Sequence, residues 1–215
     1  MRAVVSAVSL AALAAACSPS EEAAAPDATP DATPDAAPEA EEVGRADPET
    51  EAVAAAPPPQ IPEDAEVDAP DAPYDERADA VAAVDAAFDR AQSSGKRVAV
   101  IFGANWCPDC RILSGMMQLP TFEAFLDAHY ELVKVDVGRY DRNQDLVQRF
   151  GFSQGLEGVP TVVITTAEGA VVNAGTAAEW RTARERDPQE ALDYFHRFAF
   201  ERPAGDARRV AVSAG

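Results

Sequence analysis

Large aromatic side chains occur only in the second part of the chain, which limits where a folded core can form. All 15 Phe, Tyr and Trp residues lie from Tyr74 onward. Residues 18–73 instead contain 12 of the 17 prolines, with 16 acidic residues and a single basic one. Such a segment buries too little apolar surface to offset the chain entropy that folding removes. We therefore predict a disordered acidic, Pro/Ala-rich tether over 17–73, one globular domain over 74–202 and a flexible tail over 203–215.

Residues 1–16 are typical of an export signal. A basic residue, Arg2, precedes an uncharged apolar run that is too short to span a membrane. The run ends in Leu13-Ala14-Ala15-Ala16-Cys17, which resembles a bacterial lipobox, although alanine occupies position 14, where leucine is commonest. This resemblance implies that Cys17 becomes the acylated N-terminus and anchors the protein to a membrane. The alternative is a soluble secreted protein that is cut after Ala16.

The anchor and the charge restrict the location and the partners of the chain. Ser18 in place of aspartate resembles the signal for outer-membrane sorting. We therefore expect an exported protein, lipid-anchored in the bacterial cell envelope and facing the periplasm. The formal net charge of −19 argues against a nucleic-acid partner, because little positive charge is present to neutralise phosphates. We interpret the tether as a spacer, with a docking site for a basic partner as the alternative.

Helical and strand-like patterns alternate in the predicted domain, which is typical of an α/β fold. The expected helices cover about 75–93, 111–117, 122–129 (with Thr121 as N-cap), 146–150 and 191–200. The expected strands cover 97–102, 132–137 and 159–165, with a turn at 168–169 leading into an antiparallel partner at 171–172. We therefore predict a central mixed sheet of about four strands flanked by helices.

The chemistry is concentrated in Cys107-Pro108-Asp109-Cys110, which lies between a buried strand and a helix. A cysteine at a helix N-terminus is favoured as the thiolate by the helix dipole and the unpaired N–H groups. Cys107 is therefore the expected nucleophile, and Pro108 suits the first helical position. Cys110 lies one turn later, where it can close an internal disulfide and release a bound partner.

This arrangement resembles the thioredoxin family. The matching segments are Val98 to Cys110, including Trp106 directly before the first cysteine, and Gly158-Val159-Pro160-Thr161. The resemblance implies a thioredoxin-like fold, a cis Pro160 packed against the cysteine pair, and backbone groups of Val159 that bind an extended substrate. We expect the substrate-binding surface to comprise Trp106, Pro108, Asp109, Val159 and Pro160.

The chain departs from the family pattern at two places. Thioredoxins commonly keep a buried aspartate six positions before the first cysteine, to assist proton transfer to the resolving thiol, and here that position is Ile101. Lys134 matches the family's buried lysine, and Asp109, Asp136 or water are the candidates to replace the missing carboxylate. The segment 143–158 is longer than in a minimal thioredoxin and suggests an extra loop.

The resemblance and the dithiol together predict an enzyme, a thiol–disulfide oxidoreductase. It would need no cofactor beyond the Cys107–Cys110 disulfide, and no metal. Expected partners are exported proteins with cysteines or disulfides and an envelope redox partner that recycles the dithiol, with the protein itself a monomer. An anionic Asp109 opposes the Cys107 thiolate and keeps its pKa near the thioredoxin value, which favours a reductase.

Other functions remain open from the sequence alone. The domain could bind extended peptides without redox turnover, or it could act as a disulfide oxidase or isomerase. Half of a zinc site is disfavoured, because no second cysteine pair exists and His129 and His196 lie on apparent amphipathic helices. A purely structural disulfide is disfavoured because it would close a very short loop.

Overall fold

The computed structural model describes residues 56–212. The predicted signal over 1–16, the predicted acylation site Cys17 and the tether as far as residue 55 lie outside the described residues. In the part of the chain that is described, no helix is both long enough and apolar enough to cross a membrane.

A mixed sheet of three strands forms the centre of the domain. The strands are β1 (Arg97–Gly103), β2 (Tyr130–Asp136) and β3 (Thr161–Thr165), in the order β2-β1-β3. β1 pairs in parallel with β2 and antiparallel with β3. The mixed sheet is as predicted, but the fourth strand is wrong, because Val171 forms only an isolated bridge with Thr165.

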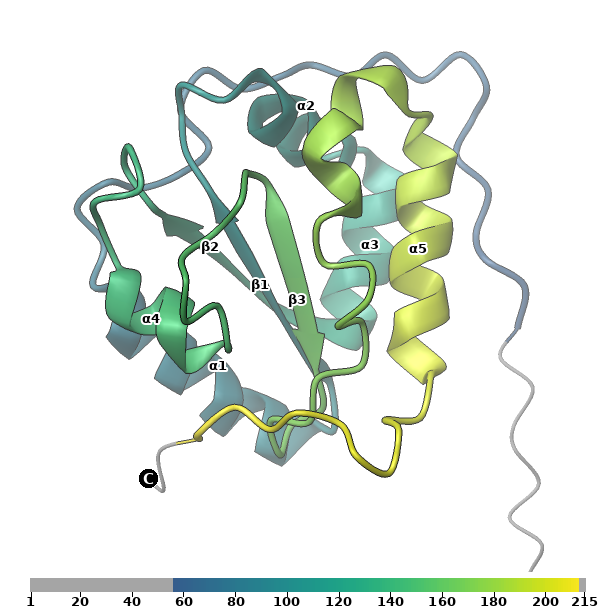
Figure 1. Cartoon of the computed structure of the whole chain (residues 1–215). Helices are drawn as coiled ribbons and strands as arrows, with labels where there is room; N and C mark the ends of the chain where they lie inside the picture. Colours follow the sequence, from purple (N-terminus) through teal and green to yellow (C-terminus); the bar gives the residue numbers. More distant parts are fainter. Residues whose placement is uncertain (1–55, 213–215) are drawn as a thin grey trace, which may run out of the picture. The chain divides into compact units, whose positions relative to one another are not determined.

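Within residues 56–212, five α-helices and one 3-10 helix surround the sheet. They are α1 (Ala80–Ser94), α2 (Pro108–Met116), α3 (Pro120–His129), α4 (Gln144–Arg149), η1 (Glu179–Glu185) and α5 (Pro188–Phe200). Figure 1 shows α1 and α4 on one side of the sheet and α3 and α5 on the other. β1 is buried along almost its whole length between these layers, as its run of apolar residues requires.

Local capping residues explain most of the helix boundaries. Asp79 accepts a hydrogen bond from the backbone of the first turn of α1, so this helix begins five residues later than predicted. It ends at Gly95, whose φ of 73° is the left-handed conformation that glycine adopts without strain. The predicted Thr121 cap is wrong, because α3 already begins at Pro120, with Leu119 at the N-cap and no side-chain capping bond.

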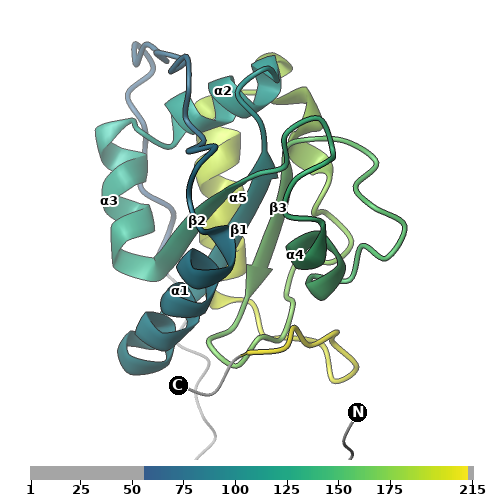
Figure 2. The ribbon, with the colours of Figure 1, turned by 90° about the vertical axis from the view of Figure 1, so that its left-hand side faces the viewer.

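The segment before α1 packs against the domain, contrary to the predicted boundary at residue 74. We call residues 56–79 the N-terminal strap. Its Pro59 carbonyl accepts a hydrogen bond from Gln189 of α5 at 3.0 Å, and its Pro70 carbonyl accepts one from Arg111 of α2, also at 3.0 Å. Figures 1 and 2 show the strap passing from α5 across the end of the sheet where α2 lies. Besides these backbone bonds, Tyr74 is buried in the core and Ile61, Ala65 and Val67 pack against it, so a few apolar side chains help to hold a segment whose overall composition is acidic and proline-rich.

The segment predicted as a flexible tail also packs in part. Val210 is buried, and its backbone N–H donates to the Gly169 carbonyl at 2.8 Å. The Val171 N–H donates in turn to the Arg208 carbonyl at 2.8 Å. These bonds satisfy backbone groups of Gly169 and Val171, in the segment predicted to form the fourth strand and its turn, so the predicted domain end at residue 202 is too early.

Candidate active site

The Cys-x-x-Cys segment lies where β1 ends and α2 begins. Cys107 is the N-cap residue of α2, with extended backbone angles, and Pro108 occupies the first helical position. The Cys107 sulfur accepts a hydrogen bond from the Cys110 backbone N–H at 3.2 Å. Cys107 is 4% exposed and Cys110 is fully buried, and both are free thiols. The helix therefore presents the first sulfur toward the surface and holds the second one behind it.

The two thiols differ strongly in acidity. The Cys110 thiol donates a hydrogen bond that lowers the pKa of Cys107 to about 7, against an opposing effect of burial. The same interaction and burial raise the pKa of Cys110 far above its ordinary value. At neutral pH, Cys107 can therefore act as a thiolate while Cys110 stays protonated.

The second matching segment lies directly beside the first cysteine. The Val159–Pro160 peptide bond is cis, as predicted. The Cys107 thiol lies 3.5 Å from the Val159 carbonyl oxygen, to which it donates. The Thr161 hydroxyl donates to the Gly158 carbonyl at 2.8 Å, which holds the turn that leads into β3. The structure thus brings Cys107, Val159 and Pro160 together from parts of the chain some 50 residues apart.

Asp109, expected from the sequence in the substrate-binding surface, is bound by a residue of η1. Its side chain is largely buried, and one carboxylate oxygen accepts hydrogen bonds from the backbone N–H and the Nε of Arg184, at 3.0 and 3.1 Å. Asp109 therefore joins α2 to η1. Its negative charge still opposes the Cys107 thiolate and raises the pKa of that thiol, which was the predicted direction. Pro108, in contrast, is exposed beside Cys107.

Trp106 belongs to an exposed aromatic pair that the sequence did not reveal. Its indole N–H donates to the Gly138 carbonyl at 2.7 Å, and the Arg139 guanidinium lies over the ring at 5.3 Å from the centroid. Tyr140 packs edge-on at 6.1 Å, and both aromatic side chains are more than 40% exposed. Tyr140 has a φ of 66°, a costly conformation for an aromatic residue. No local signal marked this loop, because it lies about 30 residues after Trp106.

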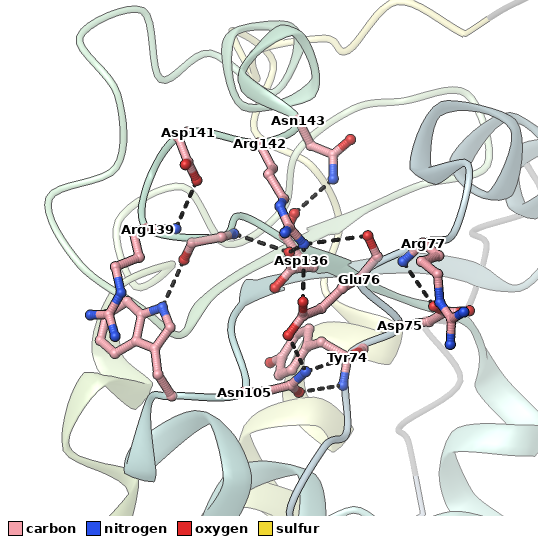
Figure 3. A network of polar contacts seen from close by, with 12 residues as sticks. Tyr74, Asp75, Glu76, Arg77, Asn105, Asp136, Arg139, Asp141, Arg142 and Asn143 are labelled. Carbon is pink, nitrogen blue, oxygen red and sulfur yellow. Dashed lines mark hydrogen bonds and ion pairs between the residues drawn. The ribbon is translucent and has the colours of Figure 1, made fainter.

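A polar network holds that loop in place (Figure 3). The Asp136 carboxylate, at the end of β2, accepts hydrogen bonds from Arg142 and from the Gly138 backbone N–H, each at 3.1 Å. Arg142 also forms an ion pair with Glu76 of the strap at 3.3 Å. Asn143 donates to the Asp136 carbonyl at 2.7 Å. The hydrogen bonds of Asp136 are therefore made to the loop and not to Cys110.

The sheet supplies no carboxylate beside the thiols at position 101, where the chain departs from the thioredoxin pattern, and Lys134 has no acidic partner there. Ile101 is fully buried in β1 and lies opposite Lys134 of β2 in the ladder. Lys134 forms no ion pair with the residues that the structure describes, and burial lowers its pKa. Over residues 56–212, no three His, Cys, Asp or Glu side chains are grouped so that they could hold a metal ion.

Comparisons with known proteins agree with this geometry. A family model described as thioredoxin-like matches residues 79–167. A thioredoxin from Alicyclobacillus acidocaldarius subsp. acidocaldarius is 32% identical over 80 residues, which is 37% of this chain and 68% of that protein. The chain belongs to the thioredoxin-like family of thiol–disulfide oxidoreductases. Its helices and strands accordingly form a thioredoxin-like fold.

A solved structure agrees with this assignment over nearly all of its length. The disulphide isomerase from Xylella fastidiosa Temecula1 is 38% identical and superposes with a TM-score of 0.54. The match covers 57% of this chain and 93% of that one. The match leaves part of this thioredoxin-like chain uncovered. That part contains more residues than the N-terminal segment 1–55, which the structure does not describe.

Proposed function

We propose that the protein reduces disulfide bonds in exported proteins through Cys107 and Cys110. The observation that carries this proposal is the placement of Cys107, whose sulfur caps α2, accepts from the Cys110 N–H at 3.2 Å and lies 3.5 Å from the Val159 carbonyl. A sulfur so placed is a thiolate for about half of the molecules at neutral pH, because its pKa is about 7. It can therefore attack a disulfide that docks against Val159 and Pro160.

The reaction would proceed by two exchanges. The Cys107 thiolate attacks one sulfur of the target disulfide and forms a mixed disulfide, and the other target sulfur leaves as a thiol. Cys110 then attacks the Cys107 sulfur, which closes the Cys107–Cys110 disulfide and releases the second target thiol. Each target disulfide thereby gains two electrons and two protons, and the oxidised enzyme needs an electron donor in the envelope to restore the dithiol.

The reducing direction rests on the acidity of Cys107. In this family a lower thiolate pKa accompanies a less stable disulfide, from about 7 in thioredoxin to about 3.5 in a strong oxidant. A pKa of about 7 for Cys107 lies at the thioredoxin end of that range. We therefore expect a reduction potential for the Cys107–Cys110 couple near −270 mV, whereas a value near −120 mV would indicate an oxidase.

Disulfide isomerisation is the second candidate function, and it is favoured by the 38% identity to a structure titled a disulphide isomerase. The two functions make different demands on Cys110. Net reduction of insulin requires both cysteines, whereas reshuffling of a scrambled disulfide protein requires attack by Cys107 alone. We expect Cys107→Ser to abolish both activities, and Cys110→Ser to abolish insulin reduction while trapping mixed disulfides. If the wild type has neither activity and Cys110→Ser traps no partner, the peptide-binding alternative is supported.

We also propose that acylated Cys17 anchors the enzyme in the cell envelope, so that the tether gives the domain reach into the periplasm. This part rests on the lipobox-like segment and on Ser18. The full-length chain should fractionate with membranes, and the outer membrane in particular, while Cys17→Ala should appear in the soluble periplasmic fraction. A wild-type chain found only in the soluble fraction would favour secretion after cleavage at Ala16.

A further inference from the structure

The N-terminal strap brings a tyrosine hydroxyl to the back of the cysteine pair. Tyr74 is 2% exposed, and it is the one aromatic residue of the strap. Its backbone is fixed two residues from the start of the Cys-x-x-Cys: the Asn105 side chain accepts from the Tyr74 N–H at 2.9 Å and donates to the Tyr74 carbonyl at 3.0 Å. Both bonds that fix this backbone thus come from the loop that carries Cys107.

The position of the ring depends on a glycine at the end of β1. A Cβ atom at Gly103 would overlap the Tyr74 hydroxyl and the adjacent ring carbons. Any other residue at position 103 would therefore displace the ring. Cys110 and Ser114, one turn apart on α2, both affect the pKa of the Tyr74 hydroxyl, which means that their side chains lie close to it.

Neither hydroxyl in this buried group is satisfied in the dithiol form. The Tyr74 and Ser114 hydroxyls are buried and have no hydrogen-bond partner among the described residues. Buried polar groups without partners are uncommon in proteins, and a catalytic role is one of the recognised reasons for them. Burial also raises the pKa of Tyr74 well above its ordinary value, so this hydroxyl remains a proton donor.

We propose that Tyr74 is a catalytic residue whose hydroxyl donates a hydrogen bond to the Cys110 sulfur as that sulfur becomes a thiolate and attacks the mixed disulfide at Cys107. This inference rests on the proposed exchange reaction. In that step the Cys110–Cys107 bond forms, the bond from Cys107 to the target breaks, and the Cys110 proton passes to the departing target thiolate. Tyr74 keeps its own proton throughout.

The surroundings of Cys110 favour this role. The titratable groups that act on the two thiols are Asp109 on α2, which Arg184 of η1 holds, Tyr74 on the strap and Tyr140 on the loop after β2. Of the groups that act on Cys110 itself, the Tyr74 hydroxyl and the Ala104 backbone N–H lower its pKa. A thiolate at Cys110 would therefore have two hydrogen-bond donors. The strap would thus supply a hydrogen-bond donor, which the apolar Ile101 cannot, without taking over the proton transfer that the family's aspartate assists.

The test separates the two exchange steps in one experiment. One equivalent of dithiobis-nitrobenzoate is mixed with the reduced full-length chain carrying Cys17→Ser, so that two thiols remain. Attack by Cys107 releases the first thionitrobenzoate, and attack by Cys110 releases the second. We expect Tyr74→Phe to leave the first phase within twofold of the parent, and to slow the second phase about tenfold or more, as loss of a hydrogen bond to a charged group requires. The midpoint of the pH profile of the second phase should move up by about one unit.

The matched control is Tyr130→Phe, which removes another buried tyrosine hydroxyl, one that donates to the Phe195 carbonyl at 2.5 Å. It should leave both phases unchanged. A second phase of Tyr74→Phe within twofold of the parent, or both phases slowed in parallel, would overturn the proposal. Thermal unfolding shows whether the packing of Tyr74→Phe is intact. We expect no fall in Tm, because phenylalanine fills nearly the same volume as tyrosine. If the parent chain itself released no second equivalent, the exchange reaction would fail, and with it the role of Tyr74.

Discussion

The acidity of Cys107 depends mainly on one neighbour, and this gives a quantitative prediction. The Cys110 thiol is the largest cause of the lowered pKa of Cys107, and the Cys110 backbone N–H contributes separately. Cys110→Ala removes the thiol donor and keeps the backbone donor. A hydrogen bond to a charged group contributes about 1.5–3 kcal/mol, and one pKa unit corresponds to about 1.4 kcal/mol. The pKa of Cys107 should therefore rise from about 7 by about one to two units.

The consequence at neutral pH is large enough to measure directly. The thiolate fraction of Cys107 at pH 7 would fall from about one half to between about 10% and 1%. The rate of iodoacetamide labelling, followed by mass spectrometry of the peptide that contains Cys107, reports this fraction as a function of pH. Cys110→Ser is the matched control, because its hydroxyl can still donate, and its shift should be clearly smaller. A midpoint for Cys110→Ala within about half a unit of the wild type would refute the reasoning.

Three further predictions follow from the same contacts. Trp106→Ala should lower kcat/KM for insulin several-fold through KM, with a change in Tm of only a few degrees, because the side chain is 43% exposed. Asn105→Ala should lower the free energy of unfolding by about 1–3 kcal/mol in urea titrations, since it removes both bonds to the Tyr74 backbone. Because the pKa of Cys107 is lowered from 9.0 to about 7, the reduced protein should gain up to about 2 kcal/mol of stability as pH rises from 7 to 9, and Cys107→Ser should not.

The strap makes a separate prediction about where the folded part begins. A chain that starts at residue 56 should resist proteolysis and urea as well as the full-length protein does. A chain that starts at residue 75 loses Tyr74 and the bonds to Gln189 and Arg111. It should unfold at lower urea, and equal midpoints for the two truncated chains would contradict the observed packing.

The parts of the site that could be predicted from the sequence are those with local signals. The apolar run of β1, the adjacent Cys107-Pro108-Asp109-Cys110 and the Val159–Pro160 pair each carry their own chemistry in a few neighbouring residues. Their meeting in space follows from the parallel and antiparallel pairing around β1. The sequence pattern therefore led to the right fold and to the sulfur that caps α2.

The parts that could not be predicted depend on contacts between distant segments. Composition placed the start of the domain at residue 74, because a proline-rich acidic segment is rarely ordered. The strap is nevertheless held by side chains of α2 and α5 that donate to its backbone carbonyls, and by a few apolar side chains of its own, too few to stand out in its composition. Tyr140 was missed for a similar reason, since only the folded loop brings it beside Trp106.

The pairing of Asp109 with Arg184 changes the electrostatic argument about direction. From the sequence, Asp109 was a free negative charge beside the nucleophile. In the structure the Arg184 guanidinium pairs with this carboxylate. Asp109 therefore opposes the Cys107 thiolate less than an unpaired carboxylate would. Arg184→Ala would leave the charge of Asp109 unpaired near the thiol, and the pKa of Cys107 should then rise. The acidity of Cys107 can thus be tuned from η1, by a residue that forms no hydrogen bond to either cysteine.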